Sequence, residues 1–249
     1  MIVLQRPLQE NDRVAAVGQL DLSQTTPVLF AVPPHQGESD GSINRNYPSV
    51  TLEDPESILV PFSHESLIVI DGDWARKRIR LRASKVTAWP AEPVTPLEAM
   101  LESHMPDTGW LSAIGKNGEL VSERMAELFQ EGVVLWRVDV PVRTREDVPT
   151  LCTFVLASDV NRAREVLTPL HGHSLVIQQS SYSRTQIEQT EVSLSHAPWP
   201  FHAAGQGLGP TGEIEVRVYV PYLTSESVQW AESAPHGLVV LRPWLNRIT

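Results

Sequence analysis

The chain has 249 residues, with 20 Lys and Arg against 30 Asp and Glu, and therefore a formal net charge of −10. This charge argues against a general nucleic-acid binder, because phosphate contacts would have to come from one basic patch in an unfavourable overall field. The single cysteine excludes an internal disulfide and is typical of a reducing compartment. The chain begins without a signal-peptide pattern and has no run of about 18 apolar residues, so we expect a soluble, cytoplasmic protein without a membrane partner.

The first third of the chain indicates β structure. Short apolar runs cover residues 13–22 and 27–32, and a polar stretch rich in Gly, Ser, Asn and Asp covers residues 33–49. A connection of that length is uncommon in a compact domain and is often functional.

The most distinctive pattern lies between residues 67 and 85. An apolar run from 67 to 70 precedes Asp71-Gly72, a dipeptide that tolerates positive φ at both central positions of a two-residue turn. We therefore expect a hairpin in which residues 67–70 pair with residues 73–76. Ile79 and Leu81 would then be buried.

Alternation of side chains along the second strand of this hairpin places five residues on one face: Trp74, Arg76, Arg78, Arg80 and Arg82. Residues 71–85 contain six bases and two acids, a balance of +4 in an acidic chain. Arginine suits bidentate contact with carboxylate or phosphate. We expect this face to bind an acidic protein surface or a small anion rather than nucleic acid.

The same arginines have an internal alternative. They could pair with acids of the chain itself, namely Glu65 and an acidic helix face formed by Glu123, Glu127 and Glu131. In that case no partner is needed, and the arginines contribute only to stability.

Three prolines between residues 89 and 96 mark the best candidate boundary in the chain. We expect a β-rich part over residues 1–90 and an α+β part over residues 91–249, either as two parts or as one compact unit. A helix is predicted over residues 95–104. A second, amphipathic helix is predicted over residues 122–130, with Leu128 and Phe129 buried.

The C-terminal part predicts two strand-helix-strand units. The first has strands at 134–142 and 151–157, a helix capped by Asp159 and a strand at 174–178; the second has a strand at 218–222, a helix capped by Thr224 and a strand at 238–241. Residues 186–194 alternate and are predicted to form a further strand. The expected fold class is α+β with antiparallel-rich sheets.

Two motifs invite a ligand but lack the required context. Gly207 to Gly212 match G-x-G-x-x-G, yet a strand rather than a helix is predicted to follow, and Pro210 has no amide to donate to a phosphate. His171-Gly172-His173 has no distinctive metal-ligand spacing. We therefore expect no cofactor, no metal and no assigned catalytic residue.

The resulting hypothesis is a non-catalytic binding protein. Two alternatives stay open. One is an enzyme with a dispersed active site, for which the first residues to inspect are His64, His171, His173 and His202. The other is a structural assembly subunit that uses sheet edges.

Overall fold

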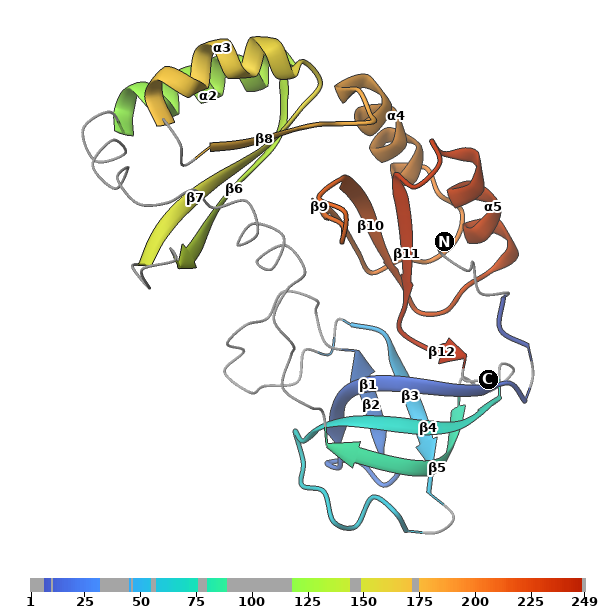
Figure 1. The fold of residues 1–249 in the computed structure, drawn as a ribbon. Coiled ribbons are helices and arrows are strands. Elements are labelled where there is room, and N and C mark those ends of the chain that lie inside the picture. Colours follow the sequence, from blue (N-terminus) through green and yellow to red (C-terminus); the bar gives the residue numbers. More distant parts are fainter. Residues whose placement is uncertain are drawn as a thin grey trace.

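The computed structural model describes residues 7–9, 11–31, 45, 47–54, 57–75, 80–88, 118–143, 149–171 and 175–247. The fold is α+β, as the sequence predicts. A β-barrel formed largely by the N-terminal part lies at one end, and a C-terminal part contains two strand-helix-strand units (Figure 1).

Five strands form the barrel: β1 (Arg13–Asp21), β2 (Val28–Ala31), β3 (Ser49–Glu53), β4 (Leu67–Ala75) and β5 (Arg80–Ala88). Their order is β1-β2-β3-β5-β4, and pairing of β1 with β4 closes the barrel. The β3–β5 pair is parallel, whereas the other pairs around the barrel are antiparallel. The predicted strands at residues 13–22 and 27–32 are confirmed.

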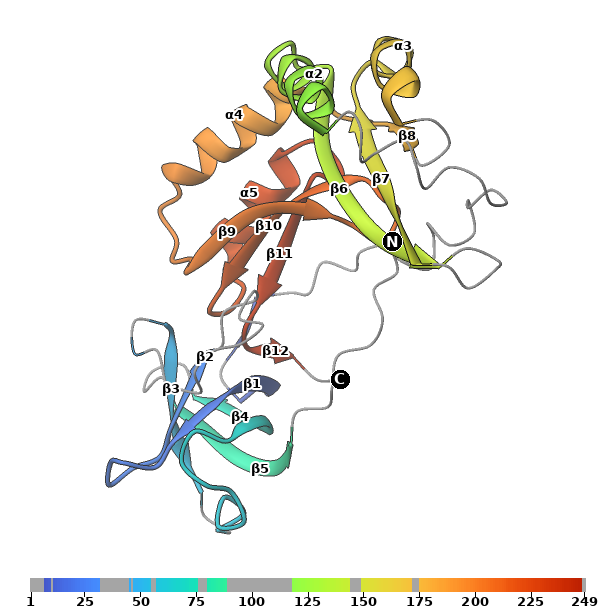
Figure 2. The same ribbon diagram turned by 90° about the vertical axis from the view of Figure 1, so that its left-hand side faces the viewer.

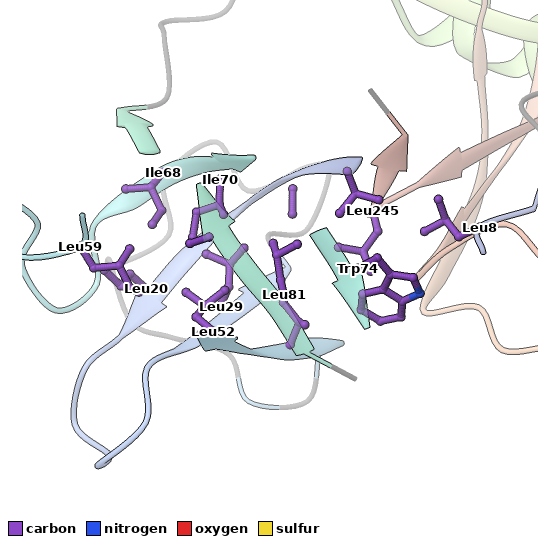
Figure 3. Packing of buried hydrophobic residues seen from close by; sticks show 14 residues of the cluster. Leu8, Leu20, Leu29, Leu52, Leu59, Ile68, Ile70, Trp74, Leu81 and Leu245 are labelled. Carbon is purple, nitrogen blue, oxygen red and sulfur yellow. The ribbon is translucent and has the colours of Figure 1, made fainter. Parts of the chain in front are cut away.

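Alternation of side chains fills the barrel. In β1, Val14, Ala16, Gly18 and Leu20 are buried. The residues that alternate with them, at 13, 15, 17 and 19, are more exposed. Equivalent inward leucines and isoleucines from the other strands meet them in one apolar cluster (Figure 3). The period of two along each strand therefore separates the interior from the outer face.

The predicted turn at Asp71-Gly72 is wrong. Both residues lie inside β4, where Gly72 pairs with Ala83 of β5 at a β-bulge. A Cβ on Gly72 would lie 2.3 Å from the backbone oxygen of Arg82, so glycine is needed there for close approach of two strands rather than for a turn. The connection between β4 and β5 is residues 76–79, which lie outside the described residues, as does the predicted burial of Ile79. Leu81 is buried, as predicted.

The last described segment of the chain joins the barrel. Strand β12 (Asn246–Arg247) pairs with Val14 and Ala15 of β1, and Leu245 is buried in the barrel cluster. The indole Nε1 of Trp244 donates a hydrogen bond of 2.6 Å to the backbone oxygen of Val17. These contacts attach the C-terminal part to the barrel.

The C-terminal part contains the same element order twice. The first copy is α2 (Gly118–Gln130), β6 (Val134–Arg143), β7 (Pro149–Ala157), α3 (Val160–His171) and β8 (Leu175–Gln179). The second is α4 (Arg184–Ser195), β9 (Ala203–Leu208), β10 (Ile214–Val220), α5 (Ser225–Ser233) and β11 (Val239–Pro243). In each copy an antiparallel pair is followed by a parallel crossover. Both predicted strand-helix-strand units are confirmed.

The caps of these crossover helices agree with the sequence. The carboxylate of Asp159 accepts a hydrogen bond of 3.0 Å from the backbone N–H of Arg162, and Thr224 forms a capping box with Ser227. A side-chain acceptor at the N-cap satisfies a backbone donor that the helix leaves free.

The strand predicted over residues 186–194 is wrong, because these residues belong to α4. A capping box between Ser183 and Gln186 starts this helix. Ile187, Thr190 and Leu194 are its buried residues, at the spacing of one helical face. Polar residues between these buried positions also produce an alternating pattern, which is why the sequence predicted a strand. In the structure, the buried positions follow the helical period.

Helices α2 and α3 cover one face of the β6-β7-β8 sheet. Val155 and Ala157 of β7 contact them in one cluster, whereas Phe154 and Leu156 contact α4 and the β9-β10-β11 sheet in another. The predicted helix over 122–130 lies within α2, with Leu128 1% exposed and Phe129 partly buried. The helix predicted over residues 95–104 lies outside the described residues.

Leu128→Ala is expected to lower the free energy of unfolding by about 2 to 5 kcal/mol, because the substitution leaves a cavity between α2 and the sheet. Chemical denaturation measures this change. Glu123→Ala, exposed on the same helix, is the control and should stay within about 0.5 kcal/mol. A Leu128→Ala variant as stable as that control would contradict the packing.

Candidate functional site

The register of the barrel separates Trp74 from the arginines with which it was predicted to share a face. Trp74 pairs with Leu81 and points into the barrel, 2% exposed, whereas the next pair, Asp73 with Arg82, is exposed on the outer face. The prediction that Trp74 shares a face with the arginines is therefore wrong. Trp74 belongs to the core (Figure 3). Its ring lies 5.8 Å from that of Tyr222.

Acidic residues flank Arg82 on both neighbouring strands. Its cross-strand partners are Asp73 in β4 and Glu53 in β3, and Asp73 is also opposite Arg13 in β1. The outer face thus carries a row of alternating charge across four strands, which we call the charge row: Arg13, Asp73, Arg82 and Glu53. Opposite charges directly across strands are stabilising, so the positive charge of Arg82 is offset within the barrel.

Lys85 is offset in the same way. It lies opposite Asp71 in β4, one step along from the charge row. The bulge at this point includes Ser84, whose Oγ donates to the backbone oxygen of Asp71 and accepts from the guanidinium of Arg13. The described outer face of β4 and β5 beyond Arg80 therefore has balanced charge.

Arg80 occupies a different position in the register. Its cross-strand partners are Thr51 in β3 and Ala75 in β4, and both are uncharged. Thr51 is also opposite Val28, the first residue of β2. At this level of the barrel, only β3 separates Arg80 from the start of β2. Arg76 and Arg78 lie outside the described residues.

The internal pairing expected between the arginines and the acidic helix face is wrong for Arg82. Glu127 pairs with Arg124 at 2.7 Å within α2, and Glu131 lies 3.7 Å from Arg162 of α3. Both views show α2 and the barrel at opposite ends of the molecule (Figures 1 and 2). Glu65, the other acid considered, lies 3.9 Å from His64. The acids that offset Arg82 come instead from β3 and β4.

A buried carboxylate that the sequence did not single out lies at the end of β1. Asp21 is 0% exposed and accepts hydrogen bonds from the backbone N–H and the hydroxyl of Ser23, and it pairs with Arg45 at 3.2 Å. The hydroxyl of Ser23 is the largest cause that holds the pKa of Asp21 below its usual value, and Arg45 adds to this effect. No sequence pattern marks this site, because its partners come from three separate segments.

His64 lies beside this carboxylate but is not arranged as a general base. Its Nδ1 is 3.4 Å from Asp21 and accepts the backbone N–H of Leu22 at 3.2 Å. An Asp–His pair that takes up a proton needs a protonated Nδ1 donating to the carboxylate and an unprotonated Nε2. The hydrogen bond from Leu22 favours the other tautomer.

The histidines considered for an enzyme are not brought together where the structure describes them. His64 belongs to the barrel, whereas His202 precedes β9 and lies between the rings of Tyr47 and Tyr219, at 6.0 and 6.2 Å. His173 and the side chain of His171 lie outside the described residues. Burial lowers the pKa of His202, and its Nδ1 is buried with no partner among the residues described.

Two adjoining cavities lie where the two repeated copies meet. Their volumes are about 390 and 480 Å³, and both are lined by Gln130, Arg184 and Glu188. Arg184 donates to Glu188 at 2.6 Å and also to the backbone oxygen of Phe129 at the end of α2. These polar contacts tie α4 to α2. The cavities are of ligand size, and their lining carries charges of both signs: Arg184 pairs with Glu188, whereas Glu191 accepts a hydrogen bond from Gln206.

The G-x-G-x-x-G motif has a structural role in the β9–β10 hairpin. A Cβ on Gly209 would lie 2.3 Å from the carboxylate of Glu215, a buried group that pairs with Arg217 at 3.1 Å. Gly212 has a φ of 74°, which suits glycine in the turn. Gly209 therefore leaves room for the Glu215–Arg217 ion pair, whose two residues both lie on β10.

Comparisons with known proteins add no assignment. No family profile matches the chain, and no curated protein matches it either. Within the described ranges, no cluster of three or more metal-ligating side chains occurs. In the same part of the chain, no helix is both long and apolar enough to cross a membrane.

Acidification should weaken the fold through His202. Because burial lowers the folded-state pKa of His202, the unfolded chain binds more protons below the ordinary histidine pKa of about 6.5. Stability present at neutral pH is then lost as the pH falls from that value through the folded-state pKa. Melting temperatures measured from pH 7.5 to 5.0 should fall less steeply for His202→Gln than for the wild type. His236→Gln, at an exposed position, should follow the wild type; identical slopes for all three proteins would contradict the expectation.

Proposed function

We propose that the protein is a non-catalytic binding protein that receives a short acidic segment of a protein partner at the β4–β5 corner. We define this corner as Arg80, the first residue of β5; Arg76, Lys77 and Arg78 precede it in the sequence and lie outside the described residues. The observation that carries the proposal is the register of Arg80. Its charge, unlike those of Arg82 and Lys85, has no acidic cross-strand partner.

The barrel provides a rigid base for such a site. Arg80 is held at the start of β5 by pairing with β3 on one side and β4 on the other. Binding residues commonly lie on connections that a rigid scaffold positions. A binding residue whose backbone is fixed in this way loses less conformational freedom on binding.

The charge of the whole chain limits how such a ligand is attracted. At a net charge of −10, the long-range field repels an acidic partner, and attraction begins only near the corner. Salt screens exposed charges over about 8 Å at physiological ionic strength. We therefore propose a short-range contact that depends on a few arginines and that weakens as salt rises.

A second candidate is single-stranded nucleic acid, favoured by the topology of the barrel. The closed order β1-β2-β3-β5-β4 resembles that of the oligonucleotide/oligosaccharide-binding (OB) barrel, in which β2, β3 and the β1–β2 and β4–β5 connections form the ligand site. This is an analogy of fold, which by itself does not imply function. The balanced charge row gives a long polyanion little to bind beyond the corner.

Arg80→Glu is expected to weaken binding of a peptide with a central cluster of glutamates by at least about tenfold, since it removes charge-assisted hydrogen bonds and adds repulsion. Its effect on the melting temperature should be small, because Thr51 and Ala75 are uncharged. Fluorescence anisotropy with the labelled peptide measures the first quantity and calorimetry the second.

Arg82→Glu is the matched control on the same strand. This change places three acids side by side in the charge row, which should destabilise the barrel by about 0.2 to 1 kcal/mol per like-charged pair. Peptide binding by the folded Arg82→Glu protein should fall much less than that of Arg80→Glu. If Arg80→Glu binds the peptide as the wild type does, the proposed function is wrong. Stronger binding of a short oligothymidine than of the peptide by the wild type would favour the second candidate.

A further inference from the structure

We infer that the cavity of about 390 Å³ beside α4 is a binding site for a small organic cation, namely a protonated amine with an apolar body. We call it the amine cavity. It lies in the C-terminal part rather than in the barrel, and the structure describes every residue that lines it. The inference stands on the geometry and charge of this cavity and does not rest on the proposed function.

One face of α4 forms one wall of the amine cavity. Arg184, Ile187, Glu188 and Glu191 line it and follow the spacing of a single helical face. The opposite wall comes from the end of α2, the start of β6 and Gln206 of β9. The cavity is therefore built by both repeated copies.

The floor of the amine cavity is apolar. Val134 and Leu135 of β6 and Ile187 of α4 line it, and all three are buried in the apolar clusters of the C-terminal part. Ligand pockets in proteins have volumes of roughly 300 to 1,000 Å³ and combine such an apolar lining with a few polar groups. The floor thus offers a surface for the apolar body of a small ligand.

The charge of the lining is negative. Its ionisable residues are Arg184, Glu188 and Glu191. Arg184 donates to Glu188 at 2.6 Å and to the backbone oxygen of Phe129, so its charge is already matched. Glu191 accepts a hydrogen bond of 2.8 Å at Oε1 from the neutral amide of Gln206. In the described part of the chain, no base forms an ion pair with Glu191, and the unmatched charge of the cavity is therefore that of its carboxylate.

Two further features favour a cation over an anion in this cavity. Phe129 and Gln130 belong to the last turn of α2, where the helix dipole is negative, and this turn contains no basic residue. The net charge of −10 also attracts cations over a longer range. An ammonium group beside Glu191 forms charge-assisted hydrogen bonds to its carboxylate, whereas an anion is repelled there.

A purely structural role of Glu191 makes a different prediction. In that case its hydrogen bond with Gln206 only ties α4 to β9, and loss of its charge alters the melting temperature at most. A binding role predicts instead that the same loss of charge weakens an amine and leaves an uncharged ligand of the same shape unaffected.

The test is an NMR titration of the full chain with 2-phenylethylamine, which is protonated at pH 7 as a lysine side chain is. Saturable binding with a dissociation constant of about 1 mM or lower is expected. Two analogues keep the apolar body and change the charge: 2-phenylethanol is neutral, and 3-phenylpropionate is an anion. Both should bind at least about tenfold more weakly, because neither forms the charge-assisted hydrogen bonds with Glu191.

Glu191→Gln is the decisive variant, because it keeps an acceptor for Gln206 and removes the charge. It should weaken 2-phenylethylamine by about tenfold or more, with a melting temperature close to that of the wild type. Glu232→Gln removes the same charge from an exposed position on α5 and should change the affinity by less than about twofold.

A second variant tests the place of binding independently of charge. Gln130 lines the cavity at the end of α2 and is exposed, so Gln130→Trp can fill the cavity without removing a buried side chain. This variant should lose saturable binding of the amine while it keeps the wild-type melting temperature.

The inference is overturned if the wild type shows no saturable binding of 2-phenylethylamine, or if 2-phenylethanol binds equally well. It is also overturned if Glu191→Gln, folded as the wild type is, binds the amine with unchanged affinity. Equal losses in Glu191→Gln and Glu232→Gln would show that only the net charge matters, which likewise contradicts a site at Glu191. None of these outcomes affects the proposal on Arg80, which the acidic peptide tests.

Discussion

The close approach of β5 to Gly72 determines which side chains of the barrel face outward. Without a Cβ at this position, the backbone of Arg82 lies against β4 and the bulge forms. The register that follows sends Trp74 and Leu81 into the barrel and leaves Asp73 beside Arg82 on the surface. Both the apolar core and the pattern of surface charge therefore depend on one contact between two backbones.

The surface charge explains how a strongly acidic protein tolerates a basic strand. Like charges close together on a strand repel, and here each described base of β5 beyond Arg80 has an acidic residue opposite it on a neighbouring strand. On the described part of β5, the positive charge without an acidic cross-strand partner is therefore confined to Arg80 at its start. A basic site at this position is local, because the charges on the rest of the described outer face of β4 and β5 are balanced.

Most patterns set by neighbouring residues were predictable from the sequence, although the alternation at residues 186–194 belongs to a helix, and contacts between distant segments were not predictable. The alternation in β1 and the caps at Asp159 and Thr224 depend on neighbouring residues, and the structure confirms these elements. The Asp71-Gly72 turn failed because a glycine needed for strand packing has the same local signature as one needed for a turn. For the candidate site, the arginines could be named, but their acidic neighbours could not, since Glu53 and Asp73 lie on other strands.

The end of β4 lies next to the contact between the barrel and the C-terminal part. Trp74 is one residue from the end of β4, and its buried ring lies beside Tyr222, which follows β10 of the second copy. Leu245 packs in the same cluster, and the adjacent Trp244 donates to Val17 of β1. Leu81, the cross-strand partner of Trp74, belongs to the same cluster. One apolar cluster therefore contains both the inward side chains of β4 and β5 and the residues that attach the second copy to the barrel.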